Sequence, residues 1–237
     1  MLAAQTSNAA LIIDQFTISQ TVNNPNNTTG ITGQVSDSGA DTFLGADREI
    51  LVQRTQASAK VVVDSGQLNF TTGHTGRASI IYDGLSANPV STVFGATPDS
   101  FGLGLNLSPY NRFQVIAGTD NSNVPLTIVL YNSATKYLTG TITLNTAAVG
   151  TQATSTLLFS SFAATGDTAA NILQNIGAVA VRLNGGYTNV SGGDARLTSL
   201  SFLETPPPPT SVPEPGTMSI VGVGFGAVAT LLRKRKA

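Results

Sequence analysis

The sequence predicts an all-β protein: a jelly-roll-like antiparallel β-sandwich over residues 10–204, followed by a short hydrophobic helical tail. Residues 10–204 consist mostly of short alternating or β-branched runs separated by turn clusters, a pattern typical of strands. Charged residues make up only 11% of the chain, against about 25% in an average protein. One short segment, Thr168–Ile176, has a helical pattern. About twelve strands with so little helix fit two packed sheets that share one core.

The predicted strands share β-branched or alternating composition, and turns are predicted at the Gly, Asn and Pro clusters between them. The strands are Leu11–Ser19, Arg48–Thr55, Lys60–Asp64, Gln67–Thr72, Ala78–Tyr82, Phe101–Leu107, Arg112–Ala117, Leu126–Tyr131, Tyr137–Leu144, Ser155–Phe159, Ala178–Leu183 and Arg196–Leu203. The turns lie at 23–27, 37–39, 83–84 and 184–186. The expected core is Ile12, Phe16, Ile50, Val52, Val61, Val63, Phe113, Val115, Ile128, Leu130, Val179, Val181, Leu200 and Phe202.

Charge divides the chain into a weakly acidic body and a basic end. Residues 1–209 hold eight Lys and Arg against twelve Asp and Glu, a net charge of −4. Nucleic-acid binding requires clustered Lys and Arg, so the body is not expected to bind nucleic acid. The chain has no cysteine, which excludes disulfides and thiolate chemistry. The single histidine, His74, is expected to be a turn or strand-edge residue rather than a metal ligand.

The composition changes abruptly after Glu204, where the β domain should end. Residues 205–212 form a proline-rich linker, because successive prolines lack N–H donors and fix φ. The segment 213–237 begins with Pro213, Glu214 and Pro215, continues through an uncharged stretch at 218–232, and ends in Arg233, Lys234, Arg235 and Lys236. As a helix, the stretch would reach about 22 Å, against a bilayer core of about 30 Å. The basic end is expected to stay in the cytoplasm.

These residues resemble the PEP-CTERM sorting domain, which is also called the ice-binding protein C-terminal domain. The family pattern is Pro-Glu-Pro, a short hydrophobic transmembrane segment and an Arg-rich end, and all three parts occur here in order. The resemblance implies recognition and cleavage by an exosortase of cyanobacteria or other exopolysaccharide-producing Gram-negative bacteria. Pro213, Glu214 and Pro215 would be the recognised motif. The membrane would then be a transient partner. A buried core helix and a permanent tail anchor are the alternatives.

Export also requires a signal at the start of the chain, and residues 1–9 are interpreted as the remnant of a signal peptide. No Lys or Arg precedes Arg48, so the usual basic n-region is missing. The small residues at 7–10 resemble the end of a signal peptide. We therefore expect the start codon to lie upstream.

The body also resembles domains found ahead of such tails in cyanobacteria and related bacteria. The matching fragments are Asp47–Ile50, Ile81–Gly84, and the strand Arg112–Ile116 with Gly118–Asp120. In outline the domain is similar to galactose-binding-like and carbohydrate-binding jelly rolls. The resemblance implies the fold and no particular ligand.

Catalysis is not expected, and the chain is predicted to be no enzyme. Glycosidase chemistry needs two carboxylates at a defined separation, and no motif places such a pair. Asp41, Asp47 and Glu49 are close in sequence and are interpreted as a loop and a solvated strand edge. No Ser or Cys triad is indicated, because His74 lies in no nucleophile motif.

Two binding sites are considered. Tyr110 and Tyr187 fall in Pro-, Asn- or Gly-rich loops and are the candidates for stacking against a sugar. Asp14, Asp41 and Asp194 are the candidate ligands of one structural calcium ion, the only cofactor considered. Ice binding is not favoured, because the threonines follow no fixed period.

The sequence therefore predicts an exported, non-enzymatic surface or matrix protein associated with exopolysaccharide. A lectin-like carbohydrate-binding module is the alternative, and an extracellular hydrolase is a weaker one. We expect the protein in the cell envelope, on the outer surface or outside the cell, after a transient inner-membrane stage.

Overall fold

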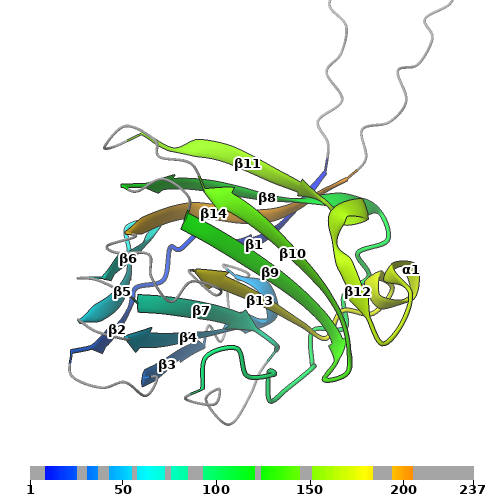
Figure 1. The fold of residues 1–237 in the computed structure, drawn as a ribbon, viewed down its shortest axis with the longest axis horizontal. Coiled ribbons are helices and arrows are strands. Elements are labelled where there is room, and N and C mark those ends of the chain that lie inside the picture. The colour runs from blue at the N-terminus through cyan, green and yellow to red at the C-terminus, as the bar shows by residue number, and fades with distance from the viewer. Residues whose placement is uncertain are drawn as a thin grey trace, which may run out of the picture. The chain divides into compact units, whose positions relative to one another are not determined.

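The computed structural model describes residues 9–25, 31–36, 43–54, 58–72, 76–84, 93–120, 124–144, 151–183 and 194–204. All of them belong to one compact unit, residues 7–205. Its strands form two seven-stranded sheets that face each other (Figure 1). All strand pairs recorded between the described residues are antiparallel. The predicted fold class, an all-β antiparallel sandwich, is confirmed.

The first sheet, sheet A, has the strand order β11-β8-β14-β6-β5-β2, and β1 also pairs with β14. Its strands are β1 Ala10–Asp14, β2 Gln20–Asn24, β5 Ala59–Asp64, β6 Gln67–Thr72, β8 Tyr110–Thr119, β11 Ala153–Leu158 and β14 Ala195–Glu204. The second, sheet B, has the order β12-β10-β9-β13-β7-β4-β3. Its strands are β3 Ile31–Ser36, β4 Asp47–Arg54, β7 Gly76–Tyr82, β9 Val124–Ser133, β10 Lys136–Leu144, β12 Ala163–Thr165 and β13 Ala178–Leu183.

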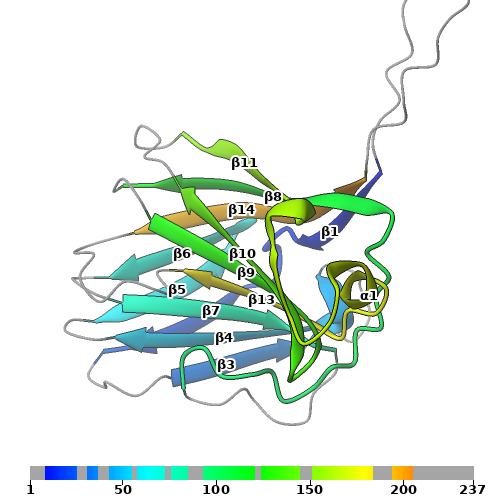
Figure 2. The same cartoon turned by 45° about the vertical axis from the view of Figure 1, so that its right-hand side comes forward.

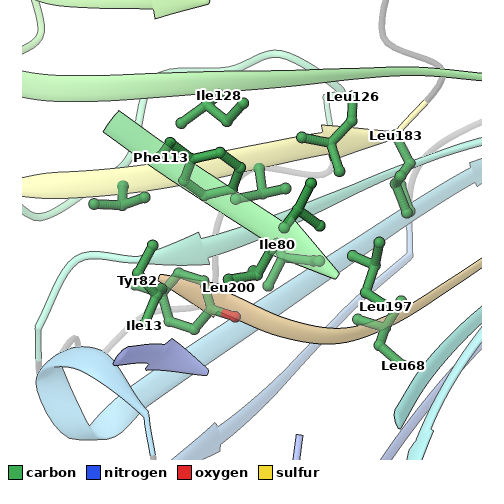
Figure 3. Close-up of a cluster of buried hydrophobic side chains, with 14 of the residues drawn as sticks. Ile13, Leu68, Ile80, Tyr82, Phe113, Leu126, Ile128, Leu183, Leu197 and Leu200 are labelled. Carbon is green, nitrogen blue, oxygen red and sulfur yellow. The ribbon is translucent and has the colours of Figure 1, made fainter. Parts of the chain in front are cut away.

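The core lies between the two sheets, where alternate residues of each strand point inward. Figure 3 shows side chains of sheet B, such as Ile80 and Leu126, facing Leu68 and Leu197 of sheet A. The predicted core residues from Phe16 to Phe202 are almost fully buried. Ile12 is the exception, with an exposed fraction of 38%. That prediction was wrong because strand alternation places Ile13 inward, so Ile12 points out.

Short elements differ most from the predictions. The helix predicted at 168–176 is present as α1, Ala169–Leu173, which Thr168 caps by accepting a hydrogen bond from Asn171 N. The strand predicted at Leu11–Ser19 ends at Asp14, and Phe16 then has a positive φ of 56°. Strands β2, β3 and β12 were not predicted. Two 3₁₀ turns, η1 Leu44–Ala46 and η2 Phe159–Ser161, complete the described elements.

The segment predicted as a strand at Phe101–Leu107 is not one. Apart from a single bridge between Leu105 and Ile176, it belongs to an irregular segment, residues 93–108, here called the strap. The strap leads toward α1 before the chain enters β8 (Figure 2). Leu103 N and Leu105 N donate to the carbonyls of Gly177 and Ile176, at 3.0 and 2.9 Å. These bonds are made to the two residues just before β13 and form one isolated bridge, so the alternation at 101–107 predicted a strand that the structure does not contain.

The chain enters and leaves the domain at the same end. The first and last strands pair, with Ala10 opposite Leu203, and β14 ends at Glu204. The predicted signal remnant, linker and sorting tail lie outside the described residues, apart from Ala9. In the part of the chain that the structure describes, no helix has the length and apolar character needed to cross a membrane.

Candidate functional site

Two strands of sheet B carry the most unusual charges of the domain. Strand β4 begins at Asp47 and pairs with β7, so that Glu49 lies opposite Ile81. Because side chains alternate, Arg48 points into the sandwich, whereas Asp47 and Glu49 point to the outer face of sheet B. Asp47 and Glu49 were expected at a solvated edge. That expectation was wrong: their exposed fractions are 0% and 1%.

The inner cluster is centred on the buried ion pair between Arg48 and Asp14. Arg48 Nη1 donates to Asp14 Oδ2 at 2.9 Å, and both side chains are fully buried. Tyr82 donates its hydroxyl to the same Asp14 oxygen at 2.8 Å, and the backbone N–H of Phe16 donates to Asp14 Oδ1 at 2.6 Å. Both carboxylate oxygens of Asp14 are therefore hydrogen-bonded, which offsets the cost of burying the charge.

The other two guanidinium nitrogen atoms of Arg48 also donate hydrogen bonds. Nε donates to Gln20 Oε1 at 2.9 Å and Nη2 to the carbonyl of Ile18 at 2.6 Å, while the guanidinium lies 5.1 Å from the Phe43 ring centre. Burial, followed by the charge of Asp14, raises the pKa of Tyr82 well above its usual range. This Arg48 cluster, made of Arg48, Asp14, Tyr82, Gln20 and Ile18, is a closed network that joins the two sheets.

The outer cluster contains only carboxylates. Glu49, Asp83 and Asp99 each offer one oxygen, and these oxygens lie within 4.8 Å of one another. Asp83 directly follows β7 and is fully buried, Glu49 is 1% exposed, and Asp99, on the strap, is open to solvent. We call these three residues the acid cluster. It is buried on the sheet side and open on the strap side.

Asp83 shows the electrostatic consequence of this arrangement. Its Oδ2 accepts a hydrogen bond from Ser100 N at 3.3 Å, whereas its buried Oδ1 has no hydrogen-bond partner among the described residues. Burial raises the pKa of Asp83 to about 7, with a hydrogen bond and the negative charge of Asp99 as further causes. The site therefore disfavours the ionised carboxylate that it contains.

Other contacts hold the strap against sheet B. Gly102 N donates to the carbonyl of Asp83 at 2.8 Å, which keeps the strap beside the end of β7. Arg182 Nη2 donates to the carbonyl of Gly95 at 3.2 Å. Farther along, the Phe101 and Tyr131 rings pack with centres 6.2 Å apart. A Cβ on Gly177 would lie only 2.6 Å from Cβ of Phe101, so a glycine is needed at this close approach. These contacts fix Asp99 next to two carboxylates.

Chemically, the acid cluster can be neutralised by a proton or by a cation. Carboxylate oxygens at such separations are the ligands that hard divalent cations prefer. The cluster was not predicted as a site. Acidic residues inside an otherwise apolar strand run were its signal, but the contribution of Asp99 depends on the path of the strap, which the sequence does not reveal.

Two of the predicted calcium ligands, Asp14 and Asp194, are not brought together. Asp14 lies opposite Leu200 in β14, whereas Asp194 precedes β14 at its other end. Six residues of strand separate the two positions, which is about 20 Å. Asp194 instead accepts a hydrogen bond from Thr72 N at 2.8 Å, and burial raises its pKa. Asp41 lies outside the described residues.

Of the two predicted sugar-stacking residues, the structure describes Tyr110. Tyr110 is half-buried at the start of β8, and its ring centre is 6.4 Å from that of Phe202 in the core. Tyr187 and His74 lie outside the described residues. So do the sorting residues Pro213, Glu214 and Pro215 and the basic residues Arg233, Lys234, Arg235 and Lys236.

Comparison with known families concerns the tail. Residues 211–236 match the model of the PEP-CTERM protein-sorting motif. The chain carries a PEP-CTERM sorting motif. The predicted resemblance is confirmed on the same residues. A PEP-CTERM signal indicates export and sorting to the cell surface.

No curated protein matches the chain. Among solved structures, the chain is similar to the family 11 carbohydrate-binding module of the cellulosomal cellulase Lic26A-Cel5E of Clostridium thermocellum. The sequence identity is 9%, the match covers 84% of this chain and 97% of that chain, and the TM-score is 0.40. The same module in complex with a β-1,3-1,4-mixed-linked tetrasaccharide has 10% identity, coverages of 84% and 98%, and a TM-score of 0.40. SGBP-B from a xyloglucan utilization locus of Bacteroides uniformis has 8% identity, coverages of 82% and 49%, and a TM-score of 0.34. Likenesses this distant do not assign a ligand to the chain.

Proposed function

We propose that the protein is an exported, non-enzymatic module of the cell surface or extracellular matrix, which an exosortase processes and which associates with exopolysaccharide. The PEP-CTERM motif at 211–236 is the observation that carries this proposal. The motif is the sorting signal, and the β-sandwich ahead of it is the part of the protein that is exported. The motif is the substrate of a separate sorting enzyme, so the chain itself does not have to carry that activity.

The body suits a structural role. The buried charged groups join the two sheets, because Arg48 of sheet B forms an ion pair with Asp14 of sheet A within a closed network. The low charge of the sequence, 11% charged residues, leaves hydroxyl and amide groups to face water and any neutral polysaccharide. A stable sandwich with a polar, weakly charged surface is what a passive matrix module requires.

The test is the intact mass of the protein in the membrane and medium fractions of its native host. We expect a mature form that ends near Pro213–Pro215 and lacks the basic end. Glu214→Gln should leave the full-length form in the membrane, while the control Glu204→Gln, at the end of β14, should be processed normally. A wild-type protein that keeps Arg233–Lys236 in the membrane would contradict processing.

Carbohydrate binding is the second candidate, and the outer face of sheet A favours it. Here Arg196 Nε donates to Asn69 Oδ1 at 3.0 Å, and Thr198 donates to Gln152 Oε1 at 2.8 Å. Arg196 is exposed, whereas its neighbours in β14 point into the core. Paired guanidinium and amide groups on a broad sheet are suited to binding sugar hydroxyls.

A glycan array probed with the full-length chain separates the two candidates. Selective, saturable binding that the double variant Asn69→Ala/Arg196→Ala abolishes would favour the lectin-like function. Thr127→Ala is the control, because Thr127 lies on sheet B and bonds only Thr141 among the recorded side-chain contacts. No binding to any glycan would leave the matrix module as the function.

A further inference from the structure

We propose that Glu49, Asp83 and Asp99 bind one calcium ion, which fastens the strap to the outer face of sheet B. These residues differ from the predicted ligand set of Asp14, Asp41 and Asp194. They come from three separate parts of the chain: strand β4, the residue after β7, and the strap.

The first argument is geometric. Calcium binds oxygen at about 2.3–2.6 Å, so two ligands on opposite sides of one ion lie about 4.6–5.2 Å apart. The three carboxylate oxygens lie within 4.8 Å of one another. A single ion can therefore touch all three without a rearrangement of the backbone. Asp99 is exposed, so water can supply the remaining ligands and the ion has a path of entry.

The second argument is an unsatisfied buried atom. Asp83 is fully buried, and among the described residues its Oδ1 has no hydrogen-bond partner. A buried carboxylate oxygen without a partner loses its hydration and gains nothing in return, which is costly. The Arg48 guanidinium cannot compensate it, because its donors bind Asp14, Gln20 and the Ile18 carbonyl on the inner side of the sheet.

The third argument is that backbone hydrogen bonds and close packing hold the carboxylates near one another. Ser100, which follows Asp99 in the strap, donates its backbone N–H to the Asp83 side chain, and Gly102 N donates to the Asp83 carbonyl. Gly84 has φ of 88°, and a Cβ there would lie 3.1 Å from the Gly102 carbonyl carbon. Backbone packed this closely keeps the carboxylates near one another, and a bound cation would relieve the repulsion between Asp83 and Asp99.

Calcium fits better than a transition metal because all three donors are carboxylate oxygens. Exported modules bind calcium with Kd values of about 10⁻⁴–10⁻³ M, which suits a site open on one side. The ion would link the strap to two strands that are otherwise held to it by hydrogen bonds and ring contacts. Its role would be to stabilise the loop that covers sheet B.

The test uses the full-length protein after removal of metals with EDTA. A calcium chloride titration, followed by calorimetry and thermal melting, should show one site per chain. A tenfold excess over Kd should raise Tm by about 3–6 °C. Hydrogen exchange at the amides of Leu103 and Leu105 should slow on calcium addition, because both anchor the strap. Sodium chloride of equal ionic strength should produce neither change.

Two variants make the result specific. Asp99→Asn, at an exposed position, should weaken calcium binding about tenfold or more without lowering the metal-free Tm, because it removes a negative charge beside Asp83. The control Asp167→Asn, at a carboxylate bound to Lys136, should respond to calcium as the wild type does. A wild type without a calcium response, or an Asp99→Asn variant that keeps it, would overturn the proposal. A response to magnesium equal to that of calcium would overturn the choice of ion.

Discussion

The Arg48 cluster and the acid cluster are built from adjacent residues of the same two strands, but their charges are balanced in different ways. Arg48 and Tyr82 point into the sandwich, whereas Glu49 and Asp83 point to the outer face of sheet B. Inside, the single carboxylate of Asp14 meets a guanidinium and a hydroxyl. Outside, three carboxylates meet one another. The chain itself supplies the counter-charge of Asp14, whereas we propose that a calcium ion binds the acid cluster.

The strongest way to break this comparison is Arg48→Met. It leaves Asp14 as an uncompensated charge between the sheets, which typically costs about 3–5 kcal/mol. We expect a corresponding loss in the free energy of unfolding, measured by urea denaturation. The double variant Arg48→Met/Asp14→Leu should recover part of the loss, because it removes the isolated charge as well. A double variant less stable than Arg48→Met would contradict this account.

A second change separates the strap from the sheet. Gly177→Ala places a methyl group 2.6 Å from Cβ of Phe101 and 2.8 Å from its carbonyl oxygen. Such overpacking costs about 1–3 kcal/mol. The amides of Leu103 and Leu105 should exchange faster, and the calcium response should weaken as Asp99 moves away. Unchanged exchange at both amides would show that the strap tolerates the methyl group.

A third change, in the acid cluster, tests whether the buried carboxylate of Asp83 destabilises the protein. Asp83→Asn keeps the shape of the side chain and removes the buried negative charge. Without divalent cations at pH 8, we expect it to raise Tm by about 2–4 °C, because the wild-type carboxylate is ionised there at a cost. The same variant should lose its calcium response. A lower Tm in EDTA would mean that the charge is already compensated.

The smallest effect is expected at a surface pair far from both clusters. Hydrogen bonds from Asn171 and Lys136 lower the pKa of Asp167 to about 2 from its usual 3.8. A depressed pKa contributes stability that is full above about pH 4 and is lost as the pH falls toward 2. Asp167→Asn should therefore change Tm by no more than about 2 °C at pH 7, because the pair is solvent-exposed. The difference from wild type should shrink at pH 2 in the same melting experiment.

The periodicity of apolar residues was enough to predict the sandwich, most of the residues in its core, and the position of α1. Runs such as Ile50–Val52 and Val179–Val181 alternate or stay β-branched over several residues, and burial of one face stabilises such runs as strands. The register of β1 was harder, because Leu11, Ile12 and Ile13 are all apolar and give no alternation to distinguish inside from outside. Ile12 was misplaced for that reason.

The acid cluster depends on contacts that local pattern does not contain. Glu49 and Asp83 meet because β4 and β7 pair, and Asp99 joins them through an irregular segment between two strands. The resemblance fragments Asp47–Ile50 and Ile81–Gly84 contain both sheet residues of the cluster. Their proximity follows from the topology, which the sequence alone did not determine.

The position of β14 has a mechanical consequence. This strand lies inside sheet A, with β8 along one side and β6 and β1 along the other, and the chain continues from its end at Glu204 into the linker. Antiparallel backbone hydrogen bonds run across the strands, so a load applied through the linker acts along β14 and shears many of them at once. A load carried through residue 204 would therefore act on a strand that is paired on both sides, and it would shear the sheet instead of unzipping it from an edge.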